Sequence, residues 1–253
     1  MDEIYKFSPS EIICNEAFLV SGYDVEDLKS RLHMSVSSLE SHMFDDDGCR
    51  RILMKHFTVN TLIGLGVEEF PTGLLAAGAL LQYLYDTQKT DLEHFTHISP
   101  YLTSKYMLLD SSTRRNLELT ETLREKQKRG SLLWVLDKTK TAMGARLLRN
   151  YIEQPLIEKD EMEKRLDAIQ ELNQDSISRD EIREYLNPIY DLERLLSKVT
   201  YKTANPRDLI AFRNSLQMLP PIKTVLSAFE KEELTKIREQ IDGLEDIYQL
   251  IDE

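Results

Sequence analysis

Apolar residues recur every three or four positions through the second half of the chain. One stripe is Met162, Leu166, Ile169 and Leu172, and a later one is Ile189, Leu192, Leu195, Leu196 and Val199. This spacing places side chains on one face of an α-helix. We therefore expect a series of amphipathic helices from Glu158 to the end of the chain.

A strong helix-start signal lies at residues 205–208. Asn205 is a favourable N-cap, Pro206 suits the first helical position, and Asp208 places an acid in the first turn. The expected helix carries Leu209, Phe212, Leu216 and Leu219. The two prolines at 220 and 221 then break or kink it, because proline lacks a backbone N–H and clashes with the preceding turn.

The first 67 residues mix helical and strand periodicities, which indicates an α/β region. Short apolar runs at Ile12–Cys14 and Met34–Leu39 predict two strands. Residues 24–31 predict a short helix with Asp24 as its N-cap. Three acids, Asp45–Asp47, suit the positive end of a helix dipole. The helix that they open carries Cys49, Ile52, Leu53 and His56 on one face.

Residues 74–85 are apolar almost all round and rich in small side chains. Such a segment predicts a helix that packs closely against several neighbours, since an exposed helix keeps a polar face. Pro71 lies just ahead of it and suits a helix start.

The stretch from Tyr106 to Leu156 predicts a short two-stranded element followed by a helix. Apolar residues near 106–109 and 117–120 flank a turn at Asp110–Ser112, whose short polar side chains bond nearby backbone groups. Beyond Thr141, apolar residues return at helical spacing until Pro155 ends the helix.

Composition narrows the class of protein. The chain has 253 residues, 41% of them hydrophobic and 30% charged, and a formal net charge of −12. Such a charge argues against a broad nucleic-acid-binding face, which needs clustered Lys and Arg. No apolar run approaches the roughly 20 residues of a membrane span, and no signal segment opens the chain. We expect a cytoplasmic protein in which Cys14 and Cys49 are reduced, buried thiols.

The sequence indicates no catalytic, cofactor-binding or metal-binding residue. No G-x-x-x-x-G-K-S/T loop is present to hold nucleotide phosphates. Asp45–Asp47 lack further ligand spacing for a metal, and His94 and His97 lack a third zinc ligand. The basic residues between Arg124 and Arg129 are typical of a solvated loop, with a phosphate contact as the alternative.

The sequence nevertheless contains distinctive short motifs at residues 110–119, 141–148 and 155–156. They resemble the core, or lever, region of the MutS family of bacterial DNA mismatch-repair proteins. Further similar runs are 64–68, 76–88, 165–169, 191–196 and 206–209. Each is short, but their order and spacing cover nearly the whole chain.

The resemblance implies a mainly α fold in two parts. Residues 1–67 would be the second half of an α/β connector domain with a ribonuclease-H-like fold. Residues 68–253 would be the helical core, or lever, ending before the DNA clamp. The family's mismatch-reading Phe-x-Glu motif occurs nowhere in the chain. We therefore expect a piece of a longer polypeptide.

The resemblance also implies a non-catalytic role in mismatch repair, in which rigid helices couple ATPase state to DNA grip. Residues 141–151 and 206–219 would form the lever, with the 110–118 turn as its joint. ATP and magnesium would bind only in an ATPase domain that this sequence lacks. The implied partners are mismatched double-stranded DNA, contacted mainly through other domains, the repair protein MutL, and a second copy of the full-length protein.

Two other functions stay open at this stage. The α/β part alone would serve as a protein-interaction module without any lever role. A metal-dependent nuclease is the remaining alternative, with Asp45–Asp47 as the metal ligands.

Overall fold

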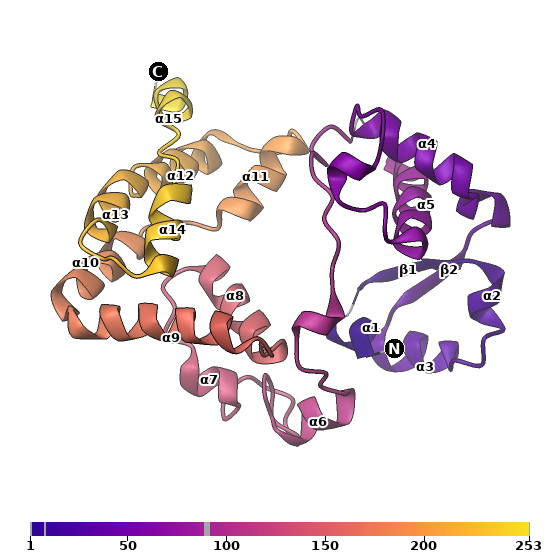
Figure 1. Ribbon diagram of the computed structural model, residues 1–253, viewed down its shortest axis with the longest axis horizontal. Coiled ribbons are helices and arrows are strands. Elements are labelled where there is room, and N and C mark those ends of the chain that lie inside the picture. The colour runs from indigo at the N-terminus through magenta and orange to yellow at the C-terminus, as the bar shows by residue number, and fades with distance from the viewer. Residues whose placement is uncertain (1, 8, 89–91, 253) are drawn as a thin grey trace. The chain divides into compact units, whose positions relative to one another are not determined.

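The structure is a computed structural model that describes residues 2–7, 9–88 and 92–252. The chain divides into two compact units, Met1–Leu102 and Thr103–Glu253. Each unit is described by itself below, with the labels of Figure 1.

The first unit combines a small parallel sheet with helices. Its elements are α1 (Asp2–Phe7), β1 (Glu11–Cys14), α2 (Glu16–Leu19), α3 (Val25–Leu32), β2 (Ser35–Ser38), η1 (Ser41–Phe44), α4 (Asp46–His56), η2 (Ile63–Leu65) and α5 (Pro71–Gln88). β1 and β2 pair in parallel, with Ile12 opposite Val36. The two predicted strands and the helices at 24–31, 46–56 and 74–85 are thus confirmed. The ribonuclease-H-like topology implied for this part stays an expectation.

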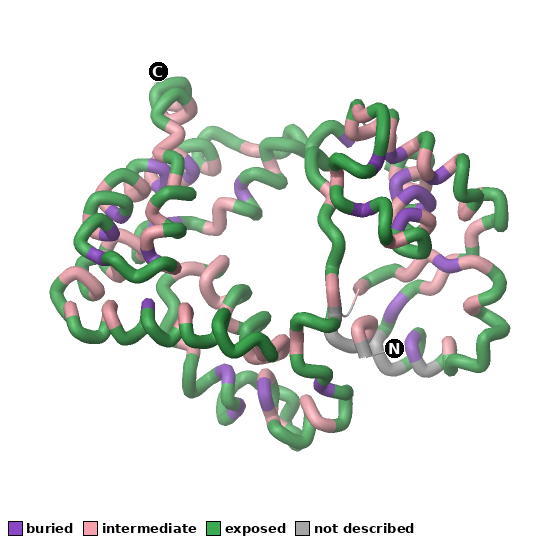
Figure 2. Tube along the Cα trace, in the orientation of Figure 1, coloured by how far each residue is buried: buried purple, intermediate pink, exposed green. Residues whose placement is uncertain are grey.

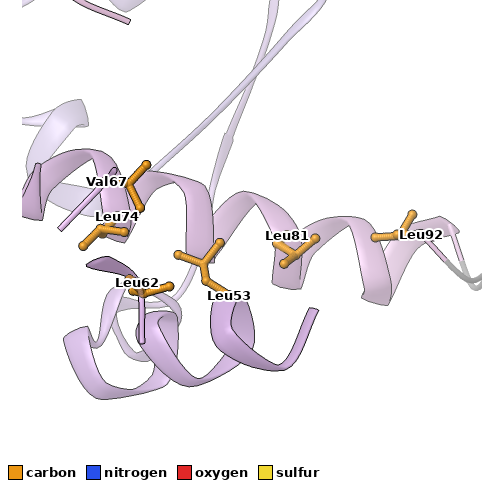
Figure 3. Close-up of a cluster of buried hydrophobic side chains, with 6 residues drawn as sticks. All are labelled: Leu53, Leu62, Val67, Leu74, Leu81 and Leu92. Carbon is orange, nitrogen blue, oxygen red and sulfur yellow. The ribbon is translucent and has the colours of Figure 1, made fainter. Parts of the chain in front are cut away.

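The core of the first unit lies mainly between α4 and α5. Figure 3 shows its six buried side chains, Leu53, Leu62, Val67, Leu74, Leu81 and Leu92. Leu74 and Leu81 lie two turns apart on α5, and both belong to the same cluster as Leu53 of α4. α5 also packs against η1, which explains why its sequence lacks a polar face.

The boundary between the units falls after Leu102, later than the predicted boundary at residues 67 and 68. α5 was expected to begin the second domain, but it packs on α4 and completes the first core. An apolar helix has to be buried against other elements, but its own sequence does not identify those elements. The sequence of α5 therefore does not show to which unit the helix belongs.

The second unit is entirely helical in its regular elements, within residues 103–252. These are η3 (Thr103–Lys105), α6 (Ser111–Asn116), α7 (Leu132–Leu136), α8 (Ala142–Glu153), α9 (Lys159–Gln174), α10 (Ser176–Leu186), α11 (Leu192–Thr200), α12 (Pro206–Leu216), α13 (Leu219–Leu226), α14 (Glu232–Gln240) and α15 (Glu245–Asp252). The expected helices after Glu158 are confirmed. α12 ends at Leu216, ahead of the two prolines, which lie in the first turn of α13.

Two hydrophobic clusters stabilise this unit. The larger one is centred on six buried residues of α9, α13, α14 and the loops beside them: Ala168, Ile189, Ile222, Leu226, Phe229 and Leu234. α10 packs against this cluster through Ile182, Tyr185 and Leu186. The smaller one joins α11, α12 and α15, with Leu195, Phe212 and Leu216 at its centre. Met143 of α8 packs against the larger cluster, so that α8 is tied to the same body.

The predicted two-stranded element at 106–120 is wrong. Residues 111–116 form α6, and Asp110 caps it by accepting a hydrogen bond from the Thr113 N–H at 2.6 Å. Tyr106 forms an isolated antiparallel bridge with Leu156 instead. An Asp-Ser-Ser sequence suits a helix N-cap as well as a turn, because both use the same side-chain to backbone hydrogen bond.

The chain is mainly α with one small sheet among the described residues, as expected. Within those residues, no helix combines the length and apolar character that crossing a membrane requires. Cys14 and Cys49 are free and buried, and burial raises the pKa of each thiol. A raised pKa disfavours the thiolate, which is the reactive form, as is typical of buried structural cysteines.

Candidate functional site

α8 begins with a tightly built cap. Thr141 accepts a hydrogen bond from the Gly144 N–H through its hydroxyl at 3.0 Å. A Cβ atom at Gly144 would lie 3.0 Å from the same hydroxyl oxygen and 3.5 Å from the Cβ of Thr139. Glycine therefore lets the preceding residues fold closely over the first turn of the predicted lever helix.

Arg146 of α8 joins this helix to α11 through a fork of hydrogen bonds. Its Nη1 and Nη2 donate to the two carboxylate oxygens of Asp191 at 2.7 and 2.8 Å, and Nη2 also donates to Glu193 at 2.5 Å. A bidentate arginine–carboxylate pair restricts both distance and orientation. The link thus holds two helices whose residues are 45 positions apart in sequence.

Asp191 has two roles at this link, because it is also the N-cap of α11. Its Oδ1 accepts a hydrogen bond from the Arg194 N–H at 3.3 Å. The Arg146 guanidinium is the main reason that the pKa of Asp191 lies below its ordinary value. One carboxylate therefore fixes both the start of α11 and the distance from α8.

A second link joins α8 to α9. The guanidinium carbon of Arg165 lies 3.7 Å from the ring centroid of Tyr151, which is a cation–π arrangement. Arg146 and Tyr151 both lie on α8, so these two links hold the helix at two separate places.

α12, the other predicted lever helix, has the N-terminal cap that its sequence predicts and is linked to two neighbouring helices. Asn205 and Asp208 form a reciprocal capping box, in which each side chain accepts from the other's backbone N–H. Lys198 of α11 donates to Asp208 at 2.7 Å and is the main cause of the lowered pKa of that carboxyl group. At the other end of α12, Arg213 pairs with Asp252 of α15 at 2.5 Å.

The predicted joint at 110–118 brings three segments together. Glu118 has a positive φ of 48°. Its carbonyl oxygen accepts from the Leu132 N–H at 3.0 Å, and its carboxylate accepts from the Leu123 N–H at 2.7 Å. α6, the 121–130 turn and α7 thus meet at one residue.

The residues considered for metal or phosphate chemistry have other hydrogen-bond or ion-pair partners or lie exposed in loops. Asp45 caps α4 through the Gly48 N–H, and Asp46 accepts a hydrogen bond from Arg50. No group of three or more His, Cys, Asp or Glu residues within the described ranges is arranged to hold a metal ion. His94 and His97 lie exposed in the loop that follows α5. Residues 124–129 form an exposed turn, in which Lys128 pairs with Asp137.

Sequence reasoning missed the Arg146–Asp191 link. Both residues lie in the motifs that carry the family resemblance, but nothing local pairs them. Asp191 lies just ahead of the apolar stripe that begins at Leu192, a position typical of an N-cap, and this signal was also overlooked. The partner of Asp191, 45 positions away, depends on tertiary packing alone.

Comparisons with known proteins agree with the resemblance. A family profile described as MutS domain III matches residues 112–253, and one described as MutS domain II matches residues 1–98. These matched ranges parallel the two structural units, which meet after Leu102.

Curated relatives match over the whole chain. The DNA mismatch repair protein MutS of Lachnoclostridium phytofermentans is 61% identical over 252 residues, which is 100% of this chain and 27% of that protein. The MutS of Ruminiclostridium cellulolyticum is 47% identical and that of Acetivibrio thermocellus 43%, again over 100% of this chain and over 28% and 29% of those proteins. The chain thus spans less than a third of each relative. It belongs to the MutS family of DNA mismatch repair proteins and carries the family's domains II and III.

Proposed function

We propose that this chain is a non-catalytic, motion-transmitting part of a mismatch-recognition protein. In this role the helices of the second unit couple the nucleotide state of an ATPase to the grip on mismatched double-stranded DNA. The observation that supports the proposal most is the bidentate link from Arg146 to Asp191, which holds α8 and α11 at a fixed distance.

A transmitting element has to move as a unit. Close-packed helices do so, because their interfaces switch between discrete arrangements and do not deform continuously. In the second unit, each lever helix is held at two places. α8 is held by Arg146 and by the Tyr151–Arg165 stack, and α12 by Asp208 and by Arg213.

ATP and magnesium enter this proposal only through the longer protein. The chain has no phosphate-binding loop of the G-x-x-x-x-G-K-S/T type, and we assign both ligands to parts of the MutS relatives outside the matched ranges. We likewise assign the contact with the mismatched base pair, and the pairing with a second copy of the protein, to parts of those relatives outside the matched ranges.

The direct test is Arg146→Ala in a full-length protein that contains this chain. We expect mismatched duplex DNA to stimulate exchange of ADP for ATP roughly tenfold less than in the unsubstituted protein, within the usual range of coupling energies. Arg149→Ala is the matched control, because Arg149 lies on the same helix and its one ion-pair partner within the described residues is Glu153, one turn away. Full coupling in the Arg146 variant, with circular dichroism unchanged, would show that the α8–α11 link transmits nothing.

A second candidate function is the docking of MutL by the first unit, as the family resemblance implies. An open cavity of about 950 Å³ lies between α4, α5 and residues 92–96. Arg51 and Lys55 line it one turn apart, and neither has an ion-pair partner within the described part of the chain. Two neighbouring positive charges favour a partner whose surface is negatively charged, because potentials across an interface are complementary.

The docking proposal is tested by the binding of purified MutL to this chain. Arg51→Glu combined with Lys55→Glu is expected to weaken it about tenfold or more, since like charges would then oppose the partner. Lys236→Glu, at an exposed lysine of the second unit, is the control. Equal binding by the double variant would place the docking site elsewhere.

A further inference from the structure

α7 exposes four large apolar side chains that are neighbours in a single short helix. Leu132, Trp134, Val135 and Leu136 are 43%, 48%, 56% and 49% exposed, and we refer to these four residues as the α7 patch. Only Leu133 of this helix is buried. At the position that Figure 1 labels α7, Figure 2 shows exposed stretches of chain interrupted by buried ones. Apolar residues that cluster on a surface in this way mark interaction sites, whereas scattered ones do not.

Hydrogen bonds at the N-terminal end of α7 fix the helix that carries the α7 patch. The buried Ser131 caps the helix, accepting from the Trp134 N–H at 3.3 Å and donating to the Lys128 carbonyl at 2.7 Å. The Leu132 and Leu133 N–H groups donate to the carbonyls of Glu118 and Leu119 at 3.0 and 2.9 Å. A surface that is already ordered loses little entropy on binding, which favours its use as a docking site.

The segments that flank the α7 patch in sequence carry a net positive charge in an otherwise acidic chain. Residues 113–140 contain eight Lys and Arg against four Asp and Glu, a net charge of +4, whereas the whole chain carries −12. The Lys128–Asp137 ion pair holds the 124–129 turn at the C-terminal end of α7. Five exposed cations lack an ion-pair partner within the described residues: Arg124, Lys126, Arg129, Lys138 and Lys140.

We propose that the α7 patch docks a protein segment with an apolar centre and an acidic rim. The apolar centre would cover the four exposed side chains, and acidic residues around it would meet the unpaired cations. Three of the four patch residues are aliphatic, which favours a protein over a single-stranded nucleic acid, because bases stack on aromatic platforms. This inference goes beyond the lever function, since a partner is able to bind here whether or not the helices transmit motion.

The chain contains a built-in reporter for this test, because Trp134 is its one tryptophan. The probe is a displayed library of random peptides, selected on the 253-residue chain and counter-selected on the Val135→Asp variant. We expect the retained peptides to combine apolar with acidic residues. Each, made synthetically, is expected to shift the Trp134 emission to shorter wavelength as the indole leaves water.

Variants separate the centre of the patch from its rim. Val135→Asp, and separately Lys138→Glu combined with Lys140→Glu, are each expected to weaken the retained peptides about tenfold or more. Ile177→Asp and Lys236→Glu are the matched controls, because both residues are exposed and lie on other helices of the same unit. Circular dichroism checks that every variant keeps its helix content.

Three results overturn the proposal. One is a selection that retains no peptide, and another is a set of retained peptides without acidic residues or with equal affinity for the Val135→Asp chain. The third is quenching of Trp134 by oligothymidylate at lower concentrations than any retained peptide requires, which assigns the patch to single-stranded nucleic acid. Loss of mismatch coupling in the Arg146 variant tests the lever separately and has no bearing on these outcomes.

Discussion

Gly78 of α5 passes directly over Cys49 of α4. A Cβ atom at Gly78 would lie 2.4 Å from the Cys49 Cβ and 2.6 Å from its Cα, distances that no pair of carbon atoms in van der Waals contact adopts. Glycine inside a helix costs roughly 0.5–1 kcal/mol relative to alanine. The close crossing of α4 and α5 accounts for its presence there, since any side chain would force the two helices apart.

Gly78→Ala is therefore expected to lower the free energy of unfolding of the first unit by about 1–3 kcal/mol, the usual range for overpacking a core. The measurement is hydrogen exchange of the α4 and α5 amides in the whole chain. Gly64→Ala is the control, because a Cβ atom there meets nothing within 4 Å. Unchanged exchange in the Gly78 variant would mean that the helices separate without cost.

Ser215 of α12 is fully buried, at 0% exposure, and bonds to another part of the second unit. Its hydroxyl accepts from the Tyr190 N–H at 3.0 Å and donates to the Ala211 carbonyl at 2.8 Å. Ser215→Ala leaves the Tyr190 N–H without this acceptor, so we expect a loss of about 1–3 kcal/mol in urea denaturation. Ser197→Ala, which removes only an exposed bond to Glu193 of its own helix, is expected to cost much less.

The second half of the chain was predictable because its signals are local. The apolar stripes after Glu158 have helical spacing, and the Asn205–Asp208 capping box is formed by residues three positions apart. Such patterns determine where a helix begins and which face it buries without reference to the rest of the chain.

The missed features depend on contacts between distant residues or on local ambiguity. Leu117 and Leu119 flank a polar residue, as apolar residues of a strand do. Glu118 between them has a positive φ, however, and the chain turns there. The partner of α5 is set by the Gly78–Cys49 crossing, and the partner of Arg146 lies on α11. No periodicity encodes either pairing, so the unit boundary and the α8–α11 link required the structure.

The capping box of α12 has a predictable contribution to stability. Asn205→Ala removes the acceptor for the N–H groups of Arg207 and Asp208, at 2.9 and 3.0 Å. We expect a loss of about 1 kcal/mol in the free energy of unfolding, as for other N-cap substitutions. Asn205→Asp keeps the acceptor and is expected to retain most of the stability, so equal losses in both variants would show that the cap itself contributes little.

Asp137 should make the stability of the second unit depend on pH. The hydrogen bond from Lys128, together with that from the Thr139 hydroxyl, lowers the pKa of Asp137 to about 2, whereas an unfolded aspartate has a pKa of about 3.9. A carboxyl group with a lowered folded-state pKa stabilises the fold above the unfolded value. That contribution disappears as the pH falls from about 4 to about 2.

Asp137→Asn is accordingly expected to be less stable than the unsubstituted chain at neutral pH, and its stability should fall less steeply between about pH 4 and pH 2. Urea denaturation at a series of pH values measures both effects. Asp246→Asn, at an exposed aspartate of α15, is the control and should keep the original slope. If the Asp137 variant followed the same pH dependence as the unsubstituted chain, the Lys128–Asp137 pair would not persist in solution, and the 124–129 turn would not be held against α7.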